Sequence, residues 1–239
     1  MTRTSEGAPT QRALVERREW DWLLVCDAGR YDVFEAVAGD YLPPDATVEP
    51  VHNGGAGFTA DWMAATFPGT YDELFAHGGQ PIHSMADSEW DERDHFATVP
   101  PYDAFAWDET YNTCPPAAVN EVVREHLSDH DRGVVRYLQP HPPLREMPER
   151  TRGRATRVRQ VANAVRAGDL SLEAVADAYR SNFEWALSEG VADLLPDLEG
   201  TVVVTADHGE CLGDCGQWFH GRGHDPHDHL VTVPWAVIE

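Results

Sequence analysis

Short apolar runs alternate along the chain with segments in which apolar residues recur at helical spacing. The runs are bounded by turn residues and predict buried strands at residues 22–26, 46–51, 134–138, 201–205 and 230–238. The other segments predict helices at residues 31–37, 60–66, 116–127 and 172–195. This alternation of strands and helices is typical of an α/β protein.

The composition indicates a folded and very acidic protein. The chain has 239 residues, of which 42% are hydrophobic, and 18 basic against 41 acidic residues give a net charge of −23. A chain of this length and apolar content can form one medium-sized core. We expect an N-terminal extension over residues 1–19 and a single domain over residues 20–239. The negative charge argues against nucleic acid as the main partner and against binding to anionic membranes.

All the basic residues are arginine, and the chain contains no lysine. An acidic, lysine-free composition resembles proteins of salt-accumulating halophiles, whose cytoplasm screens the self-repulsion of such a charge. An ordinary acidic protein from a GC-rich organism is the alternative. No apolar run reaches the length of a membrane-spanning helix, and residues 1–20 lack the apolar core of a signal peptide. We therefore expect a soluble, cytoplasmic protein of undetermined oligomeric state.

Two acidic positions follow predicted strands directly. Residues 205–210 (TADHGE) place Asp207 and His208 after the strand at 201–205, and Asp27 follows the strand at 22–26. Open α/β sheets bind ligands at the carboxyl ends of their strands. A carboxylate and an imidazole together suit zinc or manganese. Asp27 alone could instead cap the helix that follows it.

A glycine-rich loop precedes the predicted helix at 60–66 and ends in Thr59. Glycines let backbone amides approach an anion, and a hydroxyl at this position could be a nucleophile activated by a metal ion. The alternative is that Thr59 caps its helix. Four histidines gather near the C-terminus, and Gly223 with His224 forms the most informative pair. The four are His220, His224, His227 and His229.

Two further groups leave alternatives open. Cys211 and Cys215 could form a structural zinc site with His220 and His224, whose ligand types suit that metal. Seven arginines lie between residues 145 and 166, either on a solvated surface or in a loop that collects an anionic substrate. They are Arg145, Arg150, Arg152, Arg154, Arg157, Arg159 and Arg166.

Five segments together resemble the alkaline phosphatase superfamily, specifically its sulfatase-like branch. The resemblance lies in the segments at residues 25–32 (VCDAGRYD), 59–69, 137–143 (YLQPHPP), 205–210 (TADHGE) and 223–235. It implies a three-layer α/β/α sandwich with a mostly parallel central sheet. It also makes residues 20–239 the catalytic domain of a small, haloarchaeal-type member.

The resemblance implies a role for each candidate site residue. Asp27, Asp207 and His208 would bind a divalent metal, and Thr59 would be the nucleophile beside it. His141 and His224 would contact the transferred anion or a second metal. The metal would be zinc or manganese, with magnesium or calcium as alternatives, as one or two ions. Arg30 would tie the Asp27 loop together, whereas Asp32, Asp214 and His220 are candidates for extra ligands.

The resemblance departs from sulfatases at the nucleophile. A formylglycine sulfatase needs Cys or Ser followed by Pro and Arg in a C/S-x-P-x-R motif, and residues 59–63 read TADWM. The sequence therefore favours a hydrolase of small anionic phosphate esters, either a phosphatase or a phosphodiesterase. The alternatives are a sulfatase or phosphoryl-type transferase of the same fold, and a protein that binds an anionic ligand without turnover.

Overall fold

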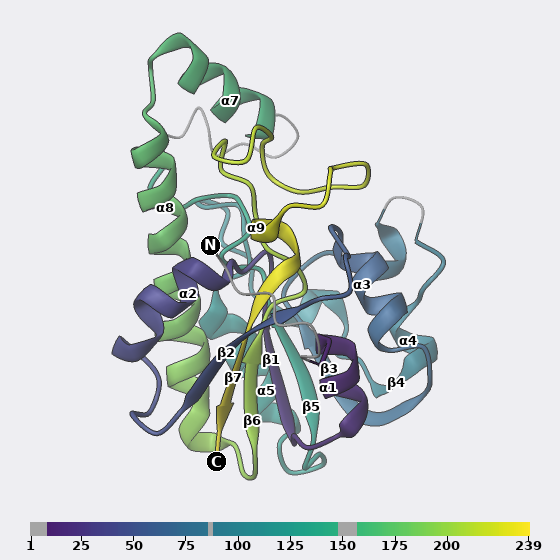
Figure 1. Ribbon diagram of the computed structural model, residues 1–239. Coiled ribbons are helices and arrows are strands. Elements are labelled where there is room, and N and C mark those ends of the chain that lie inside the picture. The colour runs from purple at the N-terminus through teal and green to yellow at the C-terminus, as the bar shows by residue number, and fades with distance from the viewer. Residues whose placement is uncertain (1–8, 86–87, 148–156) are drawn as a thin grey trace.

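The protein is built on one mixed sheet of seven strands, which are spread from left to right in Figure 1. This computed structural model describes residues 9–85, 88–147 and 157–239. The strand order is β2-β7-β6-β1-β5-β3-β4, and β7 alone runs antiparallel to its neighbours. The strands are β1 (Trp22–Cys26), β2 (Thr47–His52), β3 (Tyr71–His77), β4 (Phe96–Thr98), β5 (Gly133–Tyr137), β6 (Val202–Thr205) and β7 (Thr232–Ile238).

Helices cover both faces of this sheet (Figure 1). The α-helices are α1 (Gln11–Arg17), α2 (Tyr31–Val37), α3 (Thr59–Thr66), α4 (Glu92–His95), α5 (Pro116–His126), α7 (Arg157–Ala167), α8 (Leu172–Trp185) and α9 (Asp228–Val231). Helix α8 continues as a π-helix over Ala186–Ala192. No helix in the described part of the chain is long and apolar enough to cross a membrane.

The apolar core is divided in two by the sheet, because successive side chains of a strand point to opposite faces. Leu24 belongs to the core on one side, where α2, α5 and α8 contribute residues such as Phe183. Leu23 and Val25 belong to the other side, where α1 and α3 contribute residues such as Trp62. The protein is therefore an α/β/α sandwich with a mostly parallel sheet, as predicted.

The five predicted strands and four predicted helices are all present, with shifts at their ends. Strands β3 and β4 were not predicted. Strand β3 reads YDELFAH and carries Glu73 near its start, which breaks the apolar run that indicates a buried strand. Glu73 forms an ion pair with Arg18, so this charge is matched by a residue distant in the sequence.

Part of the predicted N-terminal extension packs against the domain. The buried side chain of Gln11 in α1 donates to the Thr205 hydroxyl at 2.8 Å and to the Ala206 carbonyl oxygen at 2.7 Å. Its oxygen accepts a hydrogen bond from the indole of Trp62 in α3. Helix α1 thus supports the segment that leads from β6 into Asp207. The boundary at residue 20 stays a prediction.

Candidate active site

The adjacent strands β6 and β1 bring Asp207 and Asp27 to the same edge of the sheet. Asp207 is fully buried, and its Oδ1 accepts hydrogen bonds from the backbone amides of Ala28 at 3.0 Å and His208 at 2.9 Å. These bonds fix the carboxylate so that Oδ2 is left for another partner. Asp27 does not cap helix α2, since the N-cap residue there is Arg30.

Asp27, Asp207 and His208 form a group whose ligand atoms lie within 4.8 Å of one another. His208 Nε2 is 3.9 Å from Asp27 Oδ1 and 3.7 Å from Asp207 Oδ2. The Nδ1 atom of His208 faces the Gly209 carbonyl oxygen at 2.9 Å, which places the ring proton there and leaves a lone pair on Nε2.

The three residues fit a divalent cation. Asp27 Oδ1 and His208 Nε2 are buried and have no hydrogen-bond partner among the described residues. Unsatisfied buried polar atoms are costly, and a shared ion would satisfy both. Ligands bound at about 2.1 Å in tetrahedral geometry lie about 3.4 Å apart, close to the separations observed. A small shift of the three side chains would bring their ligand atoms to bonding distance from one zinc or manganese ion.

Burial disfavours charge on both carboxylates, but their neighbours leave the two pKa values shifted in opposite directions. It raises the pKa of Asp27, against the attraction of Arg136, and the nearby Asp207 carboxylate raises it further. Burial also disfavours charge on Asp207, but His208 and Arg136 outweigh it and hold the pKa of Asp207 below its usual value. Desolvation lowers the pKa of His208, which keeps its ring neutral and able to ligate a cation.

Thr59 is the first residue of α3, and its side chain does not cap the helix, whose N-cap residue is Phe58. The Thr59 hydroxyl instead donates to Asp207 Oδ2 at 2.8 Å, and it accepts from Arg136 Nη2 at 3.0 Å. The structure therefore places the predicted nucleophile against the predicted ligand group. A capping role for this side chain is excluded.

Arg136 was not predicted as a site residue. It lies in β5, is only 1% exposed, and donates from Nη2 to Asp27 Oδ2 at 2.6 Å as well as to Thr59. Its Nε lies 3.7 Å from Asp207 Oδ2. The signal was present in the sequence, because an arginine inside an apolar run predicted to be a buried strand must have a charged partner.

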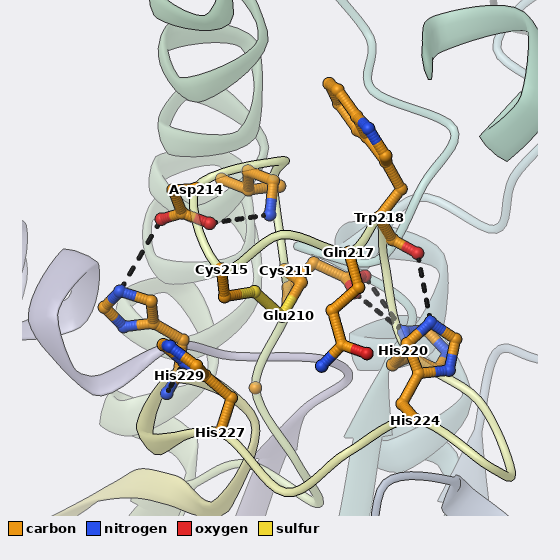
Figure 2. The surroundings of a disulfide bond; sticks show 12 residues. Glu210, Cys211, Asp214, Cys215, Gln217, Trp218, His220, His224, His227 and His229 are labelled. Atoms are coloured by element: carbon orange, nitrogen blue, oxygen red, sulfur yellow. Dashed lines mark hydrogen bonds and ion pairs between the residues drawn. A yellow bond between two sulfur atoms is a disulfide. The ribbon is translucent and has the colours of Figure 1, made fainter.

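Glu210, which is fully buried, and His220, which is half-buried, form a pair beside this group. The His220 Nδ1 atom lies 2.9 Å from a carboxylate oxygen of Glu210 (Figure 2). The His220 ring centroid is 4.2 Å from that of His208 and 5.0 Å from that of His141. Burial lowers the pKa of His220 to about 4. His220 is therefore a neutral imidazole at the edge of the candidate metal group.

The two other predicted site histidines differ in position. His141 lines the same cavity as Thr59, and its backbone amide donates to the carbonyl oxygen of Asp27. His224 lies apart from the Asp27–Asp207–His208 group. Its Nδ1 faces the Gly221 carbonyl oxygen at 3.1 Å, and its Nε2 faces that of Trp218 at 3.3 Å (Figure 2). The structure does not bring His224 into the ligand group.

A cavity of about 540 Å³ opens over this group. It is lined by Asp27, Phe58, Thr59, Gln80, Pro81, Met85, Tyr102, Trp107, Asn112, Arg136, Leu138, His141, Pro142, Pro143 and His220. Thr59 therefore borders a cavity large enough for a small molecule.

The structure does not support a zinc site built from Cys211, Cys215, His220 and His224. Cys211 and Cys215 are joined in a disulfide (Figure 2). His220 faces Glu210, and the nearest histidine that could ligate beside the two sulfurs is His227.

The neighbouring loops are held by charge pairs. Arg30 pairs with Asp32 and Asp214, so it ties the Asp27 loop to the loop after Glu210, as expected. Asp32 and Asp214 therefore meet an arginine and lie outside the ligand group. Among the seven arginines of the basic stretch, Arg145 stacks over the Trp185 ring. Arg150, Arg152 and Arg154 lie outside the described residues.

The backbone at Gly209 lies so close to the backbone at His229 that a residue with a side chain does not fit at this position. A Cβ at this position would lie 1.8 Å from the His229 carbonyl oxygen. We expect Gly209→Ala to destabilise the protein by about 3 kcal/mol and to displace His208, because overpacking against backbone cannot relax cheaply. Gly39→Ala is the matched control, since a Cβ there meets nothing within 4 Å. Chemical unfolding of both variants tests this, and wild-type stability of Gly209→Ala would contradict it.

Solved structures with the same fold act on phosphorus and sulfur esters. The C-terminal periplasmic domain of phosphoethanolamine transferase EptC from Campylobacter jejuni matches with a TM-score of 0.53 and 16% identity, over 91% of this chain and 78% of that one. Phosphonate monoester hydrolase of Agrobacterium radiobacter matches with a TM-score of 0.52 and 14% identity, over 92% and 68%. A 2-O GAG sulfatase matches with a TM-score of 0.53 and 13% identity, over 92% and 64%.

The fold is thus that of the alkaline phosphatase superfamily, which confirms the resemblance inferred from the sequence. Identities this low establish the fold alone. The chain spans less than two thirds of the length of the sulfatase. No family model and no curated protein matches the sequence.

Proposed function

We propose that the protein is a metal-dependent hydrolase of small anionic phosphate esters, with Thr59 as its nucleophile. The observation that carries this proposal is the placement of the Thr59 hydroxyl 2.8 Å from Asp207 Oδ2, within the group formed by Asp27, Asp207 and His208. A helix-capping threonine would direct its hydroxyl to backbone amides.

Asp27, Asp207 and His208 are the residues that would hold the metal ion. When bound, the ion would supply positive charge to the nucleophile and to the transferred group. Zinc and manganese suit this donor set, and the periplasmic domain of EcEptC from Escherichia coli has been solved in complex with zinc.

The lowered pKa of Asp207 keeps that carboxylate charged, and the positive charge of Arg136 and of a bound metal ion would stabilise the Thr59 alkoxide. Arg136 Nη2, at 3.0 Å from the hydroxyl, is the part of this charge that the chain itself supplies. The Thr59 oxygen, having lost its proton to water, attacks phosphorus, and the bond to the leaving alcohol breaks. Water then cleaves the bond between phosphorus and Thr59, which restores the hydroxyl and releases phosphate from a monoester substrate or a monoester from a diester. His141 contacts the transferred group at the cavity wall.

A transferase of the same fold is the second candidate, and the match to phosphoethanolamine transferase domains favours it. Such an enzyme would form the same phosphothreonine and pass the group to an alcohol in place of water. A sulfatase is less well supported, since residues 59–63 (TADWM) lack the motif that formylglycine formation requires.

Turnover of three nitrophenyl esters tests this proposal. The phosphate monoester, the phosphate diester and the sulfate would be compared with zinc, manganese or magnesium, in molar KCl to screen a net charge of −23. We expect metal-dependent release of nitrophenol from a phosphate ester. Release from the sulfate alone, or equal rates after chelation, would contradict the proposal. Adding an alcohol acceptor separates transfer from hydrolysis.

A further inference from the structure

Helix α8 carries two polar side chains on the face that it buries against the sheet. Tyr179 and Asn182 are fully buried, and residues three apart on a helix lie on the same face. The other buried residues of α8 are apolar, and most of them belong to the core on one side of the sheet (Figure 1). Buried polar groups are costly unless they are hydrogen-bonded, so the partners of these two side chains indicate their role.

Tyr179 binds the short turn that follows Asp27. Its hydroxyl donates to the Ala28 carbonyl oxygen at 2.5 Å and accepts from the Arg30 backbone amide at 2.9 Å. Ala28 has a φ of 61°, a left-handed conformation that residues other than glycine rarely adopt unless their surroundings hold it. The backbone amide of Ala28 donates to Asp207 Oδ1 at 3.0 Å. Tyr179 therefore fixes the residue that orients the Asp207 carboxylate.

Asn182 binds the loop that follows β5. Its Nδ2 donates to the Pro143 carbonyl oxygen at 3.0 Å, and its Oδ1 accepts from the Arg145 backbone amide at 2.9 Å. The same Nδ2 lies 3.5 Å from the carbonyl oxygens of Pro140 and His141. Since His141 lines the cavity, Asn182 fixes the segment that brings this histidine to the site.

The two loops also meet each other, because β1 and β5 are adjacent strands. The His141 backbone amide donates to the Asp27 carbonyl oxygen at 2.9 Å. Two side chains one turn apart on α8 thus bind two loops that meet at the candidate metal group. The geometry of the site therefore depends on this helix, although no residue of α8 lines the cavity.

We propose that Tyr179 and Asn182 are the positioning residues of these two loops, each with its own effect on the site. Tyr179 sets the affinity for the metal ion, because it fixes the orientation of Asp207. Asn182 sets the affinity for the anion, because it fixes the position of His141. This inference rests on the proposed function, since it concerns how the residues of the same site are held.

Two affinities measured on the same variants test the proposal without depending on turnover. Equilibrium dialysis gives the affinity for zinc, and calorimetry gives the affinity of the zinc-saturated protein for inorganic phosphate. We expect Tyr179→Phe to bind zinc about 10- to 100-fold more weakly, the usual cost of losing an outer-shell partner of a metal ligand. Asn182→Ala should keep the zinc affinity of the wild type and bind phosphate about tenfold more weakly, the effect of one lost hydrogen bond. A purely structural role would change both affinities together.

Tyr137→Phe and Asn120→Ala are the matched controls. The side chains of Tyr137 and Asn120 are also fully buried, Tyr137 donates to Asn120 at 2.8 Å, and Asn120 donates to the Gly190 carbonyl oxygen at 2.9 Å. These variants lose buried side-chain hydrogen bonds that involve neither loop, so they should lose stability in chemical unfolding and keep both affinities.

Circular dichroism would establish that each variant is folded, and the two α8 variants test the two halves of the proposal independently. Wild-type zinc affinity in Tyr179→Phe, or the same change of both affinities in Tyr179→Phe and Asn182→Ala, would overturn the proposal. An equal loss of zinc affinity in Tyr137→Phe would also overturn it. Failure of the proposed function alone would differ, because the variants would show these differences while the wild type hydrolysed no ester. A wild-type protein that binds no zinc would overturn both.

Discussion

Thr59→Ala is expected to lower kcat for a phosphate ester by about 10⁴- to 10⁶-fold, the loss seen when a nucleophile is removed from an enzyme that acts through a covalent intermediate. The variant removes the oxygen that lies between Asp207 Oδ2 and Arg136 Nη2. The fold should survive, because the neighbouring core residues of α3 are unchanged. Steady-state kinetics and thermal unfolding measure the two properties separately.

Thr59→Ser is the matched control for this prediction. Serine keeps the hydroxyl and loses one methyl group, so it should retain turnover within about tenfold of the wild type, close to the cost of one lost methyl contact. Alanine and serine variants with similar residual activity would show that the hydroxyl is not the nucleophile. A Thr59→Ala variant that is inactive because it is unfolded would be detected by its loss of a cooperative transition.

Asp207→Asn is expected to remove both metal binding and activity. Asp207 supplies one of the three ligands of the group and also accepts the hydroxyl of Thr59. An amide is a weaker ligand and carries no charge, so metal affinity should fall by more than the roughly 100-fold that loss of an outer-shell partner costs. Equilibrium dialysis with zinc measures this loss, and kcat should fall with bound metal.

The matched control for Asp207→Asn is Asp197→Asn. Asp197 pairs with Arg124 away from the cavity, so zinc binding and kcat should stay at wild-type values. Zinc bound at full affinity by Asp207→Asn would contradict the ligand assignment. The same outcome would move the metal to another group, of which His83, Asp91 and Glu92 is one among the described residues.

The group of Asp27, Asp207 and His208 could be predicted from the sequence, because its residues directly follow predicted strands. Asp27 and Asp207 each follow an apolar run, and the carboxyl ends of parallel strands meet at one edge of a sheet. Thr59 was predictable only with the resemblance, since a hydroxyl after a glycine-rich loop can equally cap a helix. The structure separates these alternatives through the direction of one side chain.

The sequence signals that Arg136 needs a charged partner, but which partner it meets could not be predicted, because that depends on strand order. Strand β5 lies beside β1, so Arg136 reaches Asp27, 109 residues away in the chain. The pairing of Glu210 with His220 depends in the same way on how residues 211–219 fold back. The His224 ring faces backbone carbonyls of its own loop, and its part in metal binding stays a prediction.

The most direct test of the central claim is the identity of the residue that carries the phosphoryl group during turnover. Metal-loaded wild-type protein would be mixed with excess nitrophenyl ester, quenched in acid within the first turnovers, digested and sequenced by mass spectrometry. The structure predicts a phosphoryl adduct on Thr59 and on no other residue. A protein that turns over the ester and carries the adduct on a different side chain would contradict the assignment.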